Sequence, residues 1–160
     1  MILSYILDMS NFDQASLLAS LKAFDHDPVF HKAHLYNALS LLHESLPPHS
    51  WIGFYLYDER ARALVLGPFA GTPACERIEL GKGVVGACFN FQKTIVVPDV
   101  RDFPGYISCD PLAAAELVVP VYQRKQPHGV LDIDYPQSYS FEGEQPFYEE
   151  VAKILEPFIY

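Results

Sequence analysis

The first third of the chain carries apolar residues at helical spacing. They recur three and four positions apart from Phe12 to Phe24, which predicts a helix there with Ser10 or Asn11 as its N-terminal cap. A second apolar face predicts a helix from Pro28 to Leu46, where two prolines end it. We therefore expect two helices before the spacing of apolar residues changes.

After these prolines the spacing becomes alternating, and the residues become aromatic and β-branched, which is typical of strands. The predicted strands are Trp51–Tyr57, Ala63–Leu66, Cys75–Leu80, Thr94–Pro98, Glu116–Tyr122 and Gly129–Asp134. Gly67-Pro68 is expected to end the second strand. A short helix carrying Val84 to Phe91 and a closing helix from Glu142 to Phe158 complete an α+β domain with a mainly antiparallel sheet.

Length and charge narrow the class of protein. The 160 residues fit one domain, with helices in 1–48 and the sheet and closing helix in 51–160. The 20 acidic and 11 basic residues give a formal net charge of −9, the wrong sign for nucleic acid or an anionic membrane surface. The segment 1–9 lacks the basic region of a signal peptide, and no apolar run reaches the roughly 18–20 residues that span a bilayer. We expect a cytoplasmic protein with no nucleic-acid or membrane partner.

Two acidic residues interrupt the last predicted strand. Asp132 and Asp134 are two positions apart, so both carboxylates point to the same side. They either face a polar cavity or belong to a solvated face of the sheet, because packed carboxylates need partners. Glu116 opens the neighbouring strand, and hairpin pairing could bring it close. Clustered carboxyl groups raise one another's pKa, so one of them could stay protonated and act as a general acid.

The cysteines offer a second kind of chemistry. Cys75, Cys88 and Cys109 are odd in number, which argues against a secreted disulfide framework and for thiol chemistry or simple burial. Cys109 lies in a loop predicted from Asp99 to Asp110, a setting that favours reactivity. The predicted helix around Cys88 favours packing, and the position of Cys75 leaves both interpretations open.

Two other patterns give weaker signals. His31 and His34 are three positions apart on a predicted helix, but no third ligand completes a zinc site, so a surface position is favoured and no metal is expected. The run Gly81-Lys82-Gly83-Val84-Val85-Gly86 resembles a phosphate-binding loop only loosely, because no βαβ pattern surrounds it.

A series of ordered motifs carries a family resemblance. The segments are Trp51–Tyr55, Leu64–Phe69, Pro73–Cys75, Gly81–Val84, Asp99-Val100, Phe103–Gly105, Cys109-Asp110, Glu116–Pro120 and Gly129–Asp134. Together they resemble the free methionine-(R)-sulfoxide reductases, which are single GAF-domain enzymes, from about Asn37 to the C-terminus. The resemblance implies a GAF fold, with a central six-stranded antiparallel sheet flanked by helices.

The resemblance also implies a reaction. A cysteine at the position of Cys109 attacks the sulfur of free methionine-(R)-sulfoxide, methionine leaves, and a second cysteine captures the resulting sulfenic acid. Cys75 matches a family position for that resolving thiol. Thioredoxin or another dithiol then reduces the disulfide, and no bound cofactor is required. Family members are often dimers, so a homodimer is compatible with this assignment.

The resemblance also implies roles for residues other than the cysteines. Glu116, Asp132 and Asp134 match carboxylates associated with substrate binding and reduction. Trp51 and Tyr55 could wall the pocket around the methyl sulfoxide, or could pack in the core.

One departure from the family pattern concerns the third cysteine. Val85 stands where the family usually has it, and Cys88 lies three residues further on, on the same face of the predicted helix. Cys88 is therefore a candidate extra thiol. The alternative function is a non-catalytic GAF domain that binds a small molecule as a sensor. The co-occurrence of both reactive cysteines with the three acidic residues favours the reductase.

Overall fold

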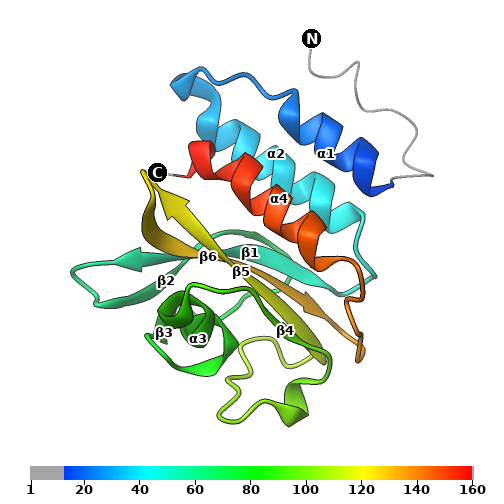
Figure 1. The fold of residues 1–160 in the computed structure, drawn as a ribbon, viewed down its shortest axis with the longest axis vertical. Helices are drawn as coiled ribbons and strands as arrows, with labels where there is room; N and C mark the ends of the chain where they lie inside the picture. The colour runs from blue at the N-terminus through cyan, green and yellow to red at the C-terminus, as the bar shows by residue number, and fades with distance from the viewer. Residues whose placement is uncertain (1–12, 160) are drawn as a thin grey trace.

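The computed structural model describes residues 13–159, and its six strands form one antiparallel sheet in the order β3-β2-β1-β6-β5-β4 (Figure 1). The strands are β1 (Trp51–Asp58), β2 (Ala63–Ala70), β3 (Arg77–Glu79), β4 (Ile95–Val97), β5 (Ala115–Gln123) and β6 (Gln126–Tyr135). Because β1 pairs with both β2 and β6, the start and the end of the sheet-forming sequence meet at its centre.

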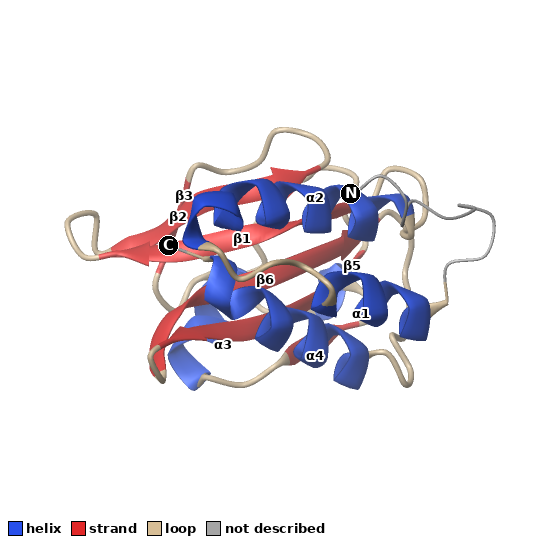
Figure 2. Ribbon diagram, turned by 90° about the horizontal axis from the view of Figure 1, so that it is seen from above, coloured by secondary structure: helices blue, strands red, loops and turns tan. Residues whose placement is uncertain are grey.

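Helices cover both faces of the sheet. The helices α1 (Gln14–Lys22), α2 (His31–Glu44) and α4 (Gln145–Leu155) lie together on one face, and α3 (Gly83–Phe91) lies on the other (Figures 1 and 2). Short 3-10 turns precede α2 at Pro28–Phe30, follow β4 at Val100–Asp102 and follow α4 at Glu156–Phe158. The predicted α+β class and the helices flanking a six-stranded sheet are confirmed.

Alternation along each strand gives each face its own core. Ile52 and Phe54 of β1 pack with the three helices of the first face, whereas Trp51 and Tyr55 pack on the α3 side. The same alternation along β6 places Asp132 and Asp134 on the α3 side, the side that buries Val130. The acidic residues therefore point away from the three-helix layer.

Two element boundaries differ from the prediction near the N-terminus and in β2. Helix α1 begins at Gln14, and the Asp13 carboxylate caps it by accepting from Ser16 N at 2.7 Å; the predicted caps Ser10 and Asn11 lie outside the described residues. Gly67-Pro68 does not end β2, which continues to Ala70. The pairing between β1 and β2 shifts register at this point, so a bulge absorbs the two residues without breaking the strand.

The third strand is shorter than the predicted Cys75–Leu80. Only Arg77–Glu79 joins the sheet. Cys75 lies in the loop before the strand, and its carbonyl accepts a hydrogen bond from the Tyr55 hydroxyl at 3.0 Å. Within residues 13–159, no helix combines the length and the apolar character needed to cross a membrane.

Candidate functional site

The two cysteines of the predicted pair meet on the α3 side of the sheet. Cys75 lies in the loop between β2 and β3, and Cys109 lies in the loop between the turn at Val100–Asp102 and β5. They form a disulfide across 34 residues of sequence, with their Cα atoms 5.1 Å apart. Both residues are half-buried.

A small cavity lies beside this disulfide. Its volume is about 20 Å³, which is room for roughly one water molecule. The residues that line it come from β1, β3, the start of α3, the Cys109 loop, β5 and β6; they are Tyr55, Ile78, Lys82, Gly83, Val84, Val85, Tyr106, Ile107, Cys109, Asp110, Glu116, Asp132 and Asp134. The cavity thus gathers Cys109 and all three acidic residues singled out in the sequence.

The acidic wall is built by two neighbouring strands. Glu116 of β5 pairs directly with Asp134 of β6, and Asp132 follows on the same face. Their exposed fractions are only 4% for Glu116, 4% for Asp132 and 8% for Asp134, so the solvated alternative is wrong. One oxygen of each carboxyl group lies within 4.8 Å of the others. Such a cluster suits a bound cation, an ammonium group included.

Burial sets the protonation of this cluster. It raises the pKa of Asp132 to about 7 and holds the pKa of Glu116 and Asp134 well above the usual carboxyl range. The negative charge of Asp132 adds to the rise at Glu116 and Asp134. Glu116 and Asp132 also share a hydrogen bond, which requires a proton between two carboxyl groups. The cluster can therefore store and donate protons near neutral pH.

Two of the carboxyl oxygens have no partner. Oδ1 of Asp132 and Oδ1 of Asp134 are buried without a hydrogen-bond partner among the described residues. Unpaired buried oxygens are costly, so a group that donates hydrogen bonds would gain strongly by binding here.

The part of the wall at the start of α3 has a different electrostatic character. Lys82, Gly83, Val84 and Val85 line the cavity where α3 begins, and the first turn of a helix carries partial positive charge on its N–H groups. Gly83 adopts φ +61°, and a Cβ there would lie 3.3 Å from Ile107. Glycine at this position lets the Cys109 loop pack closely against the start of α3.

The two predicted aromatic residues take different places. Tyr55 lines the cavity and donates its hydroxyl to the Cys75 carbonyl. Trp51 does not line it, and its ring stacks on Tyr55 and Phe69, with centroids 6.0 and 5.5 Å away. Its indole Nε1 donates to the Thr72 carbonyl at 3.0 Å. Trp51 therefore supports the wall that Tyr55 presents.

The candidate extra thiol lies away from the cavity. Val85 lines it, whereas Cys88 is fully buried behind it and donates to the Val118 carbonyl at 3.4 Å. Burial raises the pKa of the Cys88 thiol, which favours the unreactive protonated form.

The histidine prediction was wrong for one residue. His34 is 2% exposed and stacks on Phe24, with ring centroids 4.9 Å apart, because the end of α1 folds over α2.

The sequence patterns indicated no role for Lys82, Tyr106 or Asp110 in the cavity wall. Only the position of Asp110 next to Cys109 offered a signal.

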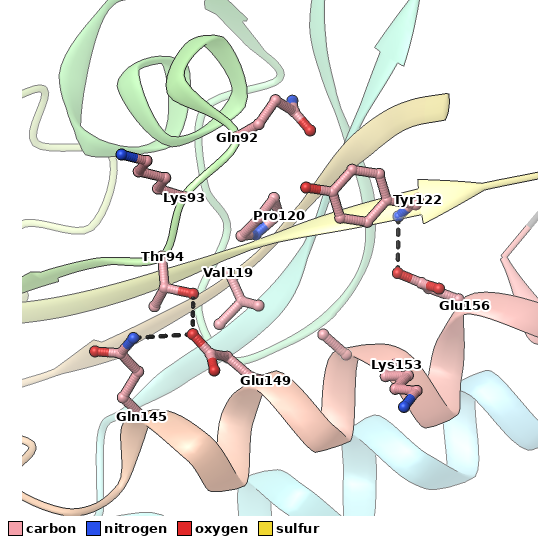
Figure 3. A pocket seen from close by; sticks show the side chains of 11 residues that line it. Gln92, Lys93, Thr94, Val119, Pro120, Tyr122, Gln145, Glu149, Lys153 and Glu156 are labelled. Atoms are coloured by element: carbon pink, nitrogen blue, oxygen red, sulfur yellow. Dashed lines mark hydrogen bonds between the residues drawn. The ribbon is translucent and has the colours of Figure 1, made fainter. Parts of the chain in front are cut away.

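A larger cavity lies elsewhere, between α4, the end of β5 and the turn after α3 (Figure 3). Its volume is about 630 Å³, and it shares no residue with the disulfide cavity. Thr94 and Gln145 donate to Glu149 at its rim, and Glu156 accepts from Tyr122 N at 3.0 Å. No cysteine lines this cavity, whereas Cys109 lines the smaller one.

Comparisons with known proteins agree with this geometry. The GAF domain family matches residues 35–158. The free methionine-R-sulfoxide reductase of Saccharomyces cerevisiae is 36% identical over 146 residues, covering 87% of this chain and 81% of that protein. The enzyme of the same name from Escherichia coli is 40% identical over 124 residues, covering 76% of this chain and 74% of that protein.

A solved structure shows the same arrangement over nearly the whole chain. The free methionine-R-sulfoxide reductase from Neisseria meningitidis, crystallised with its substrate, superposes with a TM-score of 0.84 at 36% identity, covering 96% of this chain and 95% of that chain. Fold, cavity and sequence identity together show that this chain belongs to the GAF domain family and, within it, to the free methionine-R-sulfoxide reductases.

Proposed function

We propose that this protein reduces free methionine-(R)-sulfoxide to methionine, with Cys109 as the nucleophile and Cys75 as the resolving thiol. The observation that carries this proposal is the Cys75–Cys109 disulfide at the edge of a buried cavity lined by three carboxyl groups. A disulfide in this place is the expected product of one turnover.

The electrons and atoms balance in two steps. The Cys109 thiol attacks the sulfoxide sulfur, the sulfoxide is reduced to methionine, and Cys109 leaves the step as a sulfenic acid. The Cys75 thiol then displaces the hydroxyl group from that sulfur, which forms the disulfide and releases water. The substrate thus accepts two electrons, and the cysteine pair supplies them.

The carboxyl cluster serves this chemistry in two ways. The sulfoxide oxygen is a poor leaving group until it is protonated, and the raised pKa of the cluster keeps protons available near neutral pH. The ammonium group of a free amino acid would also satisfy the unpaired oxygens of Asp132 and Asp134. Both demands explain why three carboxyl groups are buried together.

The cavity is too small for an amino acid while the disulfide is closed. Its volume of about 20 Å³ holds only a water-sized group. Reduction would remove the covalent link between the two loops, so that Tyr106 and Ile107 can move aside and the substrate can enter.

The reductant in this proposal is thioredoxin or another dithiol. The half-exposed disulfide supports it, because exchange requires direct attack on a sulfur atom. A cytoplasmic location fits the same chemistry, since thiols stay reduced there. The mechanism uses no bound cofactor.

A turnover assay with matched cysteine variants tests the proposal. We expect methionine from free methionine-(R)-sulfoxide with dithiothreitol, and none from Cys109→Ser. Cys75→Ser should keep activity with dithiothreitol, which can reduce the sulfenic acid directly, but lose activity with thioredoxin. Cys88→Ala is the control and should retain both activities. Absence of turnover by folded wild-type protein would refute the enzyme and favour the ligand-binding sensor.

A further inference from the structure

Asp110 is a buried carboxylate in an otherwise exposed stretch of loop. It is 4% exposed, whereas Ser108, Pro111 and Leu112 around it are exposed. Burying a carboxylate is unfavourable unless its oxygens gain partners. Its burial next to Cys109 therefore calls for an explanation from its contacts.

The hydrogen bonds of Asp110 bracket Cys109. Its side-chain Oδ1 accepts from Leu112 N at 2.9 Å, and its carbonyl accepts from Ala113 N at 3.2 Å. The same carbonyl accepts from the Ser108 hydroxyl at 3.3 Å. An aspartate that accepts from the N–H two residues on forms an Asx turn, which fixes the backbone at that point. The Asp110 side chain thus fixes the backbone just after Cys109, and the Asp110 carbonyl accepts from residues on both sides of Cys109.

The other cysteine is held in a comparable way. The Tyr55 hydroxyl donates to the Cys75 carbonyl at 3.0 Å, from the wall of the same cavity. Each sulfur is therefore carried by a backbone segment that one side chain of the cavity fixes. The position of each sulfur affects the reaction rate, because misplacing a reacting group by 1 Å can slow a reaction on the order of 100-fold.

We infer that Asp110 is a positioning residue for Cys109: its Oδ1 closes the turn that keeps the Cys109 sulfur at the cavity and within reach of Cys75. The role belongs to the acceptor oxygen of the side chain. The expected effect of Asp110 on turnover rests on the proposed function, whereas its expected effect on disulfide formation does not.

Three substitutions separate this role from others. Asp110→Asn keeps a side-chain oxygen that forms the same turn, Asp110→Ser offers a weaker acceptor, and Asp110→Ala offers none. Asp102→Ala, at an exposed aspartate earlier in the same loop, is the matched control. Thermal melting of each variant verifies that it is folded.

The first measurement is disulfide formation in fully reduced protein treated with diamide, which takes two electrons from the cysteine pair and becomes the hydrazine. We expect Asp110→Asn and the control to react at the wild-type rate, Asp110→Ser to be slower, and Asp110→Ala to be slower by about 10- to 100-fold. The kcat for methionine-(R)-sulfoxide should follow the same order, because turnover requires the Cys109 sulfur at the cavity.

Two outcomes would overturn the inference. Asp110→Ala at the wild-type rate would show that the turn is dispensable, and Asp110→Asn as slow as Asp110→Ala would show that the charge matters and the acceptor does not. If the order holds with diamide but the wild-type protein reduces no methionine sulfoxide, the positioning role is supported and the proposed reaction fails.

Discussion

At the scale of single residues, the Tyr55 hydroxyl is the sharpest case to test. It donates to the Cys75 carbonyl, while its ring lines the cavity and stacks on Trp51. Tyr55→Phe should lower stability by about 0.5–1.5 kcal/mol and slow the closure of the disulfide, because the Cys75 loop loses its anchor. Urea unfolding and diamide kinetics measure both effects.

The matched control for that substitution is Tyr57→Phe. Tyr57 lies two positions further along β1 and stacks on Phe89, with ring centroids 5.4 Å apart, a contact that phenylalanine keeps. Equal disulfide kinetics in the two variants would contradict the anchoring role of the Tyr55 hydroxyl.

The buried imidazole of His34 is a second residue-scale case. Both ring nitrogens lack a hydrogen-bond partner among the described residues, and the ring stacks on Phe24. His34→Phe keeps the aromatic contact and removes two unpaired polar atoms, so the free energy of unfolding should stay equal or rise by about 1 kcal/mol. Calorimetry measures the change. His31→Phe is the contrast and should destabilise, since His31 Nε2 bonds the His26 carbonyl at 3.1 Å.

The carboxyl cluster makes stability depend on pH with a definite sign. Burial raises the pKa of Asp132 from 3.8 to about 7, so the folded state binds this proton more tightly than the unfolded state does. The stabilisation is complete below about pH 4 and is lost as the pH rises to about 7. We expect a loss of roughly 2–4 kcal/mol over this range, measured by urea unfolding of the oxidised protein.

Asp132→Asn removes that titration while keeping the size of the side chain. Its unfolding free energy should vary less between pH 4 and 7 than that of the wild type. The same slope in both proteins would show that Asp132 is not a buried acid with a raised pKa.

At the scale of elements, α3 depends on close contact with the turn after β3. A Cβ at Gly86 would lie 2.5 Å from the Glu79 carbonyl oxygen and 2.9 Å from Gly81 N, both backbone atoms. Gly86→Ala should push α3 outward and destabilise the protein by about 1–3 kcal/mol. Phe91→Ala, at a residue 70% exposed on the same helix, is the control and should change little. Equal melting temperatures would contradict tight packing of α3.

The elements were predictable where the periodicity is local. Alternation along the last strand placed Asp132 and Asp134 on one side, and the pairing of β5 with β6 brings Glu116 next to them. The alternation of side chains along a strand does not show which face of the sheet other parts of the chain cover. Burial of the cluster depends on α3 and the Cys109 loop packing over it, which are long-range contacts.

Local signals also failed where tertiary structure overrides them. Gly67-Pro68 reads as a strand end, yet a bulge opposite β1 carries β2 through it. Asp110 reads as an ordinary loop aspartate, and only the folded loop shows its hydrogen bonds on both sides of Cys109.

At the scale of the whole molecule, the larger apolar core and the candidate site lie on opposite faces of one sheet. The larger apolar core lies between the sheet and the layer of α1, α2 and α4, whereas the cysteines and carboxyl groups lie on the α3 side. The site draws on β1, β5, β6 and two loops that are distant in sequence. The three-helix face therefore holds most of the apolar core, and the candidate site lies on the other face.

A single turnover without any reductant tests the central claim most directly. Fully reduced protein is mixed with excess free methionine-(R)-sulfoxide, methionine is counted per protein, and the disulfide is located by peptide mapping. The account predicts about one methionine per chain and a disulfide between Cys75 and Cys109. Methionine without that disulfide, a disulfide through Cys88, or no methionine from folded protein would contradict it.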